Sequence, residues 1–364
     1  MADTTLGTAS PARRSGGWRI ERLPSPVWVQ VLIPFLAIGL AFLITSILVL
    51  MAQANPLDAF YYLLIEPIST RNGALDVLVK ATPILFTGLA VLVAFSGGYF
   101  NIGAEGQLLA GAIAAAGLGV TLQESSPWLA IPIILLAGFI AGALWALLPA
   151  LLRVYLRVDE VVTTLLLNSV MALGLSGLLT GPWRDPSGWP RTPMIAEAIR
   201  LPRLAPPSRL RAGILLGIAI LLILWFVLRR TAFGVKLRAV GLEPRAARFM
   251  GINVPRTVLI AALVSGGIAG LAGTTEILGI QGRLIAESSP GYGYTGVVVA
   301  MLAGLSAPGV LIAACFIALV ETGSLSLSQA LNVPQYLGDV VQAVTLITML
   351  ACLLLTNYRL RRQK

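Results

Sequence analysis

The 364-residue sequence contains no histidine, only two cysteines, and charged side chains at just 12% of its positions. The lack of histidine excludes a His-based catalytic triad, a His-ligated metal and a His proton switch. Cys315 and Cys352 lie in separate apolar runs, which indicates small buried residues and no disulfide framework. There is no Gly-x-x-x-x-Gly-Lys-Ser/Thr stretch, so any dependence on ATP must come from a partner.

The sequence is instead rich in hydrophobic residues. Hydrophobic residues make up 57% of the chain and the mean hydropathy is +0.86, a balance that predicts an all-α polytopic membrane protein. The net charge of +10 could indicate nucleic-acid binding. In a membrane protein it is better explained by cytoplasmic loops rich in Lys and Arg, so no nucleic-acid partner is expected.

Apolar runs predict about ten transmembrane helices, and most of the runs lack charge for long enough to cross the hydrocarbon core. The run at 294–305 is too short to cross alone and is predicted to be a half-helix. The ten predicted spans are 27–51, 75–96, 103–122, 128–152, 160–180, 212–229, 257–279, 294–305, 309–329 and 337–356.

Three regions are expected along the chain. Residues 1–25 are polar, contain four arginines and are predicted to be a basic cytoplasmic tail. Residues 26–358 form the transmembrane domain, and residues 359–364 a basic cytoplasmic tail. Because the first apolar run, Val27–Met51, is long and lacks a small-residue cleavage site, we interpret it as an anchor and not as a removable signal.

Charge predicts the orientation. With both termini inside the cell, 17 of the 26 Lys and Arg residues fall on the cytoplasmic side. The segment Gly181–Arg211 is then external despite its six arginines. Its seven prolines predict a stiff, irregular loop, which could dock an external substrate-binding protein.

A polar hinge, Gly97–Gln107, interrupts the apolar helices. It places Asn101, Glu105 and Gln107 within or at the edge of the bilayer, where a carboxylate is costly and usually marks a site or a pathway. The two amides could bind sugar hydroxyls or base edges. The alternative is a tight cytoplasmic turn in which Glu105 is simply solvated.

Further polar groups suggest a substrate path. Asn168 lies at membrane depth, where it could line a pathway or join helices. A second broken segment, Gly282–Gly296, carries Tyr292 and Tyr294, which could stack on a base or belong to the interfacial aromatic belt. Because the predicted spans that precede the two breaks run in opposite directions, the pattern indicates an inverted repeat with a site between its halves.

Four stretches resemble, in this order, the permease subunits of ATP-binding-cassette (ABC) importers for nucleosides. They are Phe100–Gln107 (FNIGAEGQ), Asp159–Asn168 (DEVVTTLLLN), Gly241–Ile252 (GLEPRAARFMGI) and Pro290–Val297 (PGYGYTGV). The related sugar permeases usually carry an Asp-Leu-Ser-type sequence at the first stretch. The resemblance implies the ten-helix fold shared with cobalamin-importer permeases and the larger of two dissimilar permease subunits in the bacterial inner membrane.

The resemblance also implies a motor contact. A short helix is expected over Pro244–Met250, with Glu243 at its N-terminal end and Gly251 at its C-terminal stop. Such permeases insert a coupling helix of this kind into the ATPase, and the small side chains would let it enter a cleft. The residues assigned to this contact are Gly241, Glu243, Ala246, Ala247 and Gly251.

The implied partners are an ABC ATPase, which carries ATP and Mg²⁺, a second permease, an extracytoplasmic binding protein and membrane lipid. No cofactor, metal or catalytic group is expected on this chain, so a membrane enzyme has no support. Two alternative functions remain open. One is a permease for a simple sugar such as a pentose. The other is an ion-coupled secondary transporter, against which the basic loop and the lack of a clear buried charge pair argue.

Overall fold

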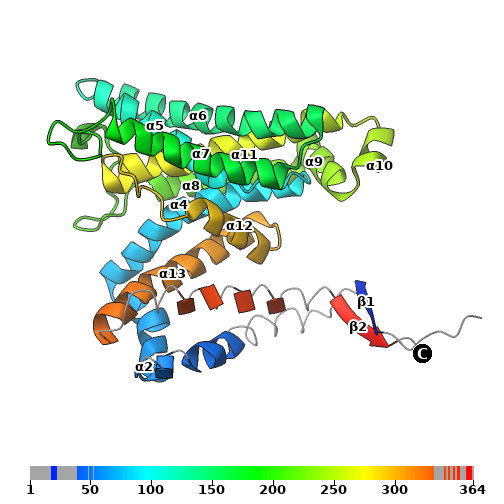
Figure 1. Ribbon diagram of the computed structural model, residues 1–364, viewed down its shortest axis with the longest axis horizontal. Helices are drawn as coiled ribbons and strands as arrows, with labels where there is room; N and C mark the ends of the chain where they lie inside the picture. Colours follow the sequence, from blue (N-terminus) through cyan, green and yellow to red (C-terminus); the bar gives the residue numbers. More distant parts are fainter. Residues whose placement is uncertain are drawn as a thin grey trace, which may run out of the picture.

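The computed structural model describes residues 18–22, residues 39–331 except 48 and 52, eight positions between 340 and 352, and residues 358–362. This part of the chain is helical apart from a short antiparallel pair in which β1 (Trp18–Arg22) lies against β2 (Tyr358–Arg362) (Figure 1). The all-α class is therefore confirmed. The major helices are α4 (Arg71–Ser96), α5 (Ala104–Thr121), α6 (Pro127–Leu156), α7 (Glu160–Thr180), α8 (Gly213–Arg230), α11 (Val254–Glu276) and α13 (Ala307–Leu331).

Shorter elements complete the described fold. Before α4 the chain forms α2 (Pro56–Phe60), the π-helix η1 (Tyr61–Ile65) and α3 (Glu66–Ser69). The later short elements are η2 (Glu197–Ile199), α9 (Ala232–Leu242), α10 (Pro244–Phe249), the π-helix η3 (Ile277–Gln281) that continues α11, and α12 (Tyr292–Leu302).

Seven helices of the described residues are long and apolar enough to cross a membrane, and they coincide with seven of the ten predicted spans. The predicted half-helix at 294–305 is α12, which has 11 residues. The span at 27–51 is described only from residue 39, and most of the span at 337–356 lies outside the described residues. The multi-pass class is thus confirmed, while the total of ten stays a prediction.

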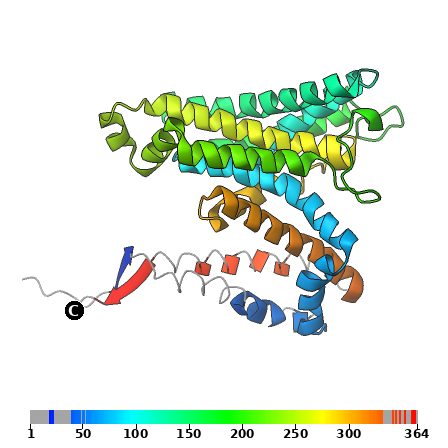
Figure 2. The ribbon, with the colours of Figure 1, turned by 180° about the vertical axis from the view of Figure 1, so that it is seen from behind.

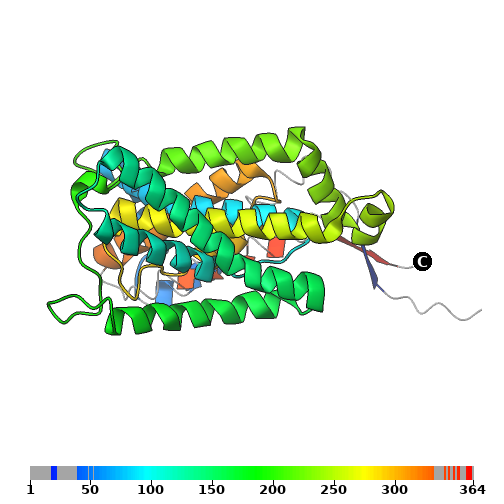
Figure 3. The same cartoon turned by 90° about the horizontal axis from the view of Figure 1, so that it is seen from above.

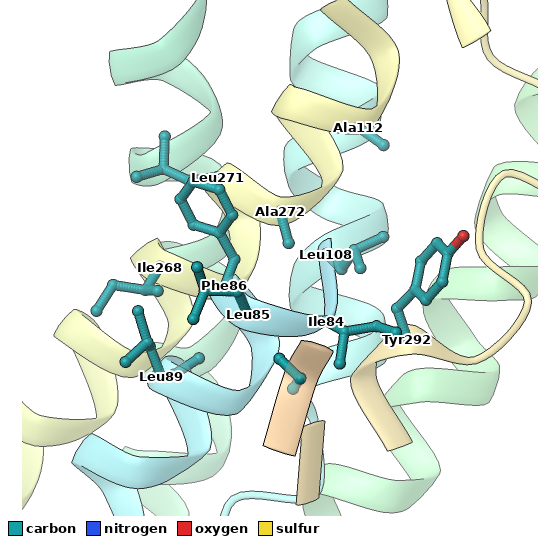
Figure 4. Packing of buried hydrophobic residues seen from close by; sticks show 14 of the residues in the cluster. Ile84, Leu85, Phe86, Leu89, Leu108, Ala112, Ile268, Leu271, Ala272 and Tyr292 are labelled. Carbon is teal, nitrogen blue, oxygen red and sulfur yellow. The ribbon is translucent and has the colours of Figure 1, made fainter. Parts of the chain in front are cut away.

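Helix α4 is the centre of the bundle. Its second half, from Ala81 onward, carries no charge, so the helix is apolar around its whole circumference and is buried on all sides. Helices α11, α12 and α13 pack against it. Figure 4 shows this packing, with Phe86 and Leu89 of α4 beside Ile268 and Leu271 of α11, and Tyr292 of α12 across from them.

Two breaks in the helices position the candidate site. The chain leaves α4 through Gly98, whose φ of 70° favours glycine, and α5 begins at Ala104. It leaves the π-helix η3, passes an irregular segment and enters α12 after Gly291, whose φ is 101°. Since Ala94 lies near Ala262 while Thr82 lies near Thr275, helices α4 and α11 run antiparallel, as the predicted inverted repeat requires.

The bundle has two distinct ends. Helices α9 and α10 lie at one end, here the α10 end, and the 181–212 segment lies at the opposite end, here the loop end (Figures 2 and 3). The strands β1 and β2 lie toward the α10 end (Figure 1). The two polar regions therefore lie at opposite ends of the bundle, as the predicted topology requires.

Arginines attach the 181–212 segment to the bundle. Arg200 donates to the carbonyls of Gly279 and Ile280 in η3 at 2.8 and 3.0 Å, and Arg211 Nη2 lies 2.8 Å from Glu197 Oε1. Desolvation raises the pKa of the Glu197 carboxyl, but the hydrogen bond and charge of Arg211, with the charges of Arg200 and Arg203, outweigh it and hold that pKa below its usual value. The segment is therefore tied to the π-helix that ends α11.

Glycines allow α6 and α11 to touch through their backbones. A Cβ added at Gly142 would overlap the carbonyl oxygen of Gly266 and lie 2.7 Å from the Cα of Gly270. A Cβ added at Gly138 would overlap the hydroxyl of Thr274. This close approach brings dispersion contacts that larger residues would prevent, a common basis of helix association in membranes.

The packing predicts opposite effects of the same substitution at two helical glycines. Gly142→Ala forces α6 away from α11 and should lower the unfolding free energy by about 1–3 kcal/mol. Gly177→Ala in α7 meets nothing within 4 Å and should be neutral or stabilise by up to about 1 kcal/mol through helix propensity. Thermal unfolding in detergent measures both, and equal midpoints for the two variants would contradict the packing.

Candidate functional site

The hinge side chains form a buried hydrogen-bonded cluster. Asn101 and Gln107 pair through their amides, with Asn101 Nδ2 donating to Gln107 Oε1 at 2.9 Å and Gln107 Nε2 donating back to Asn101 Oδ1 at 3.1 Å. Asn101 Nδ2 also donates to Ser265 Oγ of α11 at 3.0 Å. Both amides are almost fully buried. The pair therefore closes the hinge on itself and fastens it to α11.

Asn168 holds the hinge from the opposite side. Its Oδ1 accepts from the Gly106 backbone N–H at 2.8 Å, and its Nδ2 donates to the Ile102 carbonyl at 2.9 Å. The same Nδ2 lies 3.3 Å from the hydroxyl of Tyr294 in α12. One buried side chain thus links α7, the hinge and α12. Asn168 was predicted either to line a pathway or to join helices, and in this geometry it joins helices.

Glu105 joins the two half-helices. Its Oε2 accepts a 2.7 Å hydrogen bond from the Gly293 N–H in the first turn of α12, while Glu105 itself lies in the first turn of α5. The positive ends of both helices therefore face one carboxylate. A Cβ added at Gly293 would overlap the backbone N and Cα of Glu105, so the two first turns meet backbone to backbone. Glu105 is buried, and the interpretation as a solvated turn residue is wrong.

The two predicted tyrosines differ in surroundings. The ring of Tyr292 is buried beside α4 (Figure 4), and its carbonyl accepts from the Thr87 hydroxyl at 2.9 Å. Tyr294 is 42% exposed, and its hydroxyl meets Asn168. Among the predicted pathway residues, Tyr294 alone is exposed, and it lies beside the polar cluster.

Helix α10 appears where it was expected, at Pro244–Phe249, one residue shorter than predicted. Glu243 caps it by accepting from the Arg245 N–H at 3.1 Å, and Gly251, with a φ of 78°, follows its end. Ala246 is exposed, whereas Ala247 is fully buried within this chain.

The exposed surface of the α9–α10 unit includes three large apolar residues among charged ones. Leu242, Phe249 and Met250 are 85%, 94% and 67% exposed. Gly241 is exposed on one side and packs closely on the other, where a Cβ would overlap the Ser96 carbonyl oxygen and lie 3.1 Å from the Gly98 nitrogen. Within Gly241–Met250 only Ala247 is buried, so of the two alanines Ala246 faces outward while Ala247 serves the internal packing of the unit.

The structure therefore brings Asn101, Glu105, Gln107, Asn168 and Tyr294 into one cluster, with Tyr292 attached through the backbone. The coupling residues lie apart, at the α10 end. Sequence reasoning missed Ser265, although a hydroxyl in an otherwise apolar helix was a usable signal. It also missed Leu242, Phe249 and Met250, whose apolar character alone could not show that they face outward.

A multi-pass helical bundle with interrupted helices that meet at their N-terminal ends is the architecture of a transporter. The chain belongs to the family described as the permease component of branched-chain amino acid transport systems, whose model matches residues 73–350. It is accordingly a permease of an ABC importer, a transport component. This assignment decides against the ion-coupled rival.

Three relatives show the range of named substrates. The chain is 34% identical to the glucose ABC transporter permease TsgB13 of Haloferax volcanii, over 92% of the chain and 90% of the relative. It is 33% identical to the guanosine permease NupP of Bacillus subtilis, over 75% and 79%. It is 30% identical to the nucleoside permease NupB of Lactococcus lactis, over 81% and 84%. No solved structure matches the chain.

The junction of α5 and α12 predicts a difference between two substitutions at Glu105. Glu105→Ala leaves the buried Gly293 N–H without an acceptor and should lower the unfolding free energy by about 1–3 kcal/mol. Glu105→Gln keeps an oxygen at the same place and should cost less. Thermal unfolding of the two purified variants tests this order, and equal losses would mean that the hydrogen bond does not hold the half-helices together.

Proposed function

We propose that the chain forms the translocation pathway for a nucleoside in an ABC importer driven by a separate ATPase. The observation that carries this proposal is the exposed residue Tyr294, whose hydroxyl contacts the buried amide of Asn168 next to the hinge. A nucleoside needs an aromatic face for its base and amide or carboxylate groups for its sugar hydroxyls and base edges. The guanosine and nucleoside relatives support the same substrate class.

The pathway residues take two roles in this proposal. Tyr294, with Asn168 behind it, offers the contact surface. Asn101, Glu105, Gln107 and Tyr292 are enclosed in the described conformation and bond within the chain. They reach the substrate when the junction between α5 and α12 opens, as alternating access requires.

A simple sugar is the second candidate, favoured by the glucose permease relative and its long alignment. Hydroxyl groups would then bind the same amides, and the aromatic face would matter less. The first hinge stretch lacks the Asp-Leu-Ser-type sequence of sugar permeases and argues for the nucleoside.

Substitutions at Tyr294 separate the two substrates. Tyr294→Phe keeps the ring, whereas Tyr294→Leu removes it. Base stacking contributes about 1–3 kcal/mol, so Tyr294→Leu should slow nucleoside uptake by about tenfold while Tyr294→Phe stays within a few-fold of wild type. The measurement is uptake of radiolabelled guanosine, uridine and glucose in cells that express all subunits. Uptake of glucose but of neither nucleoside would establish the sugar instead.

The partners follow from the two ends of the bundle. We assign the α10 end, with β1 and β2, to the cytoplasm of the bacterial inner membrane, because most of the basic residues lie in segments at this end. Both chain termini are then cytoplasmic in this proposal. The ATPase, which carries ATP and Mg²⁺, docks on α10. The binding protein docks at the loop end on residues 181–212. A second, dissimilar permease completes the pathway within the bilayer.

The proposed docking surface consists of Ala246 and Phe249 on α10, Leu242 at the end of α9 and Met250 after α10, all of which are exposed. An apolar surface of this kind at an aqueous end of the molecule indicates a protein contact. Glu243 and Gly251 shape the helix without joining the contact themselves.

Adjacent alanines of α10 provide a matched test of this surface. Ala246→Arg should leave the unfolding midpoint unchanged but release the ATPase from the purified complex, because a long cation enters a packed contact at a cost of about 1–3 kcal/mol or more. Ala247→Arg should instead lower the midpoint of the permease itself, since Ala247 is internal. Retention of the ATPase and normal transport by Ala246→Arg would remove α10 from the interface.

In a background without Cys315 and Cys352, Phe249→Cys should react with an impermeant thiol reagent only after permeabilisation, which checks the orientation.

A further inference from the structure

A cavity lies at the α10 end, beside the first residues of the hinge, Gly97–Tyr99. It has a volume of about 260 Å³ and is bounded by the segment after α4, the C-terminal end of α6, α10 and the start of α11. Three arginines line it: Arg153 and Arg157 from the end of α6, and Arg248 from α10. Its remaining lining is largely apolar and includes Val154 and Pro255.

The arginines of this cavity are only partly neutralised. Arg153 Nε lies 2.9 Å from Glu160 Oε2, which balances one charge. Within the part of the chain that the structure describes, neither Arg157 nor Arg248 has a carboxylate within ion-pair distance. Two unbalanced guanidinium groups around one cavity attract an anion, and guanidinium groups bind phosphate oxygens in pairs.

Tyr99 provides an independent sign of a ligand. Tyr99 is 1% exposed and packs with Ala94, Ala150 and Ala262. It also belongs to the cavity lining. Its buried hydroxyl has no hydrogen-bond partner among the described residues. Buried hydroxyl groups are nearly always bonded, so an unbonded one in a residue that borders a cavity is a candidate donor. The hydroxyl is closed off from solvent, so it donates to a ligand oxygen only when the ring shifts toward the cavity.

Arg157 lies at the cavity where α6 ends. Its φ of 57° is in the left-handed region, a common way for a helix to stop, and its backbone N–H bonds the Leu152 carbonyl. The end of α6 therefore places this side chain beside Arg153 in the cavity lining.

The surroundings favour a lipid as the source of the phosphate. The cavity is partly apolar, and the adjoining stretch of α6 exposes Leu148, Leu151 and Tyr155 as a membrane-facing helix would. Basic pockets between transmembrane helices on the cytoplasmic side bind anionic head groups. We propose that Tyr99, Arg153, Arg157 and Arg248 form a site for a phosphate group carried by an anionic membrane lipid.

An occupied site has a mechanical consequence. The phosphate joins Arg248 on α10 to Arg153 and Arg157 on α6, so the lipid ties the ATPase-facing helix to the bundle. Binding itself does not depend on the transported substrate. Assignment of the lipid to the cytoplasmic leaflet rests on the orientation proposed above.

The test uses the full-length chain in a neutral detergent, titrated with short-chain phosphatidylglycerol, with phosphatidylcholine of the same chain length, or with sodium phosphate. The readouts are the thermal unfolding midpoint and the number of lipids retained in native mass spectrometry. Phosphatidylglycerol should raise the midpoint and remain bound, while phosphatidylcholine should do neither. Arg157→Gln and Arg248→Gln should each weaken phosphatidylglycerol binding by about tenfold or more.

Two further variants make the test specific. Arg245→Gln removes the same charge from the same helix, but Arg245 does not line the cavity and binding should be unchanged. Tyr99→Phe should weaken binding by about fivefold without lowering the midpoint of the lipid-free chain. An equal loss in Arg245→Gln and Arg248→Gln would show general attraction of charge and overturn the site.

The remaining arms identify the source. A midpoint shift with sodium phosphate alone that is lost in Arg248→Gln would keep the phosphate site but overturn its assignment to a lipid. If the ATPase subunit displaces bound phosphatidylglycerol, the arginines belong to the ATPase interface and the lipid assignment fails. Neither result bears on nucleoside uptake, so the failure of this proposal and of the proposed function are distinguishable.

Discussion

The contact between the first turns of α5 and α12 is the constraint on which the rest of the bundle depends. Glu105 accepts the Gly293 N–H across 188 positions of sequence, and the two backbones touch because Gly293 has no side chain. A carboxylate between two positive helix ends is stabilised even where water is scarce. The polar hinge can therefore lie inside an apolar bundle only while this junction is closed, or while a ligand replaces its hydrogen bonds.

The same junction can be reached mechanically from the α10 end. Gly241 of α9 packs on Ser96 and Gly98, where α4 ends and the hinge begins. The hinge then bonds through Asn101 to α11 and through Ile102 to Asn168 of α7. A force on the α9–α10 unit thus acts directly on the chain segment that carries the site. Close-packed contacts of this kind switch between discrete arrangements and do not stretch continuously.

Much of this arrangement was predictable from local patterns. The apolar runs located the seven long helices, and the Pro244 and Gly251 signals located α10 to within a residue. The hinge residues were found because a carboxylate and two amides stand out among apolar neighbours. The inward turn of Ala247 was missed, since the composition of a six-residue helix does not reveal which face meets the bundle. The partners Ser265 and Gly293 were missed because they come from distant segments.

The sequence by itself determined the class of protein, the places where helices start, stop and break, and the polar groups that had to lie at membrane depth. These depend on hydrophobicity, glycine and proline positions and charge, which act over a few residues. The tertiary structure was needed to show that Asn101 pairs with Gln107, that Glu105 joins two half-helices, and that Tyr292 is buried while Tyr294 is exposed. Hydrogen-bond partners and exposure depend on which helices lie side by side, and that follows from packing the whole bundle.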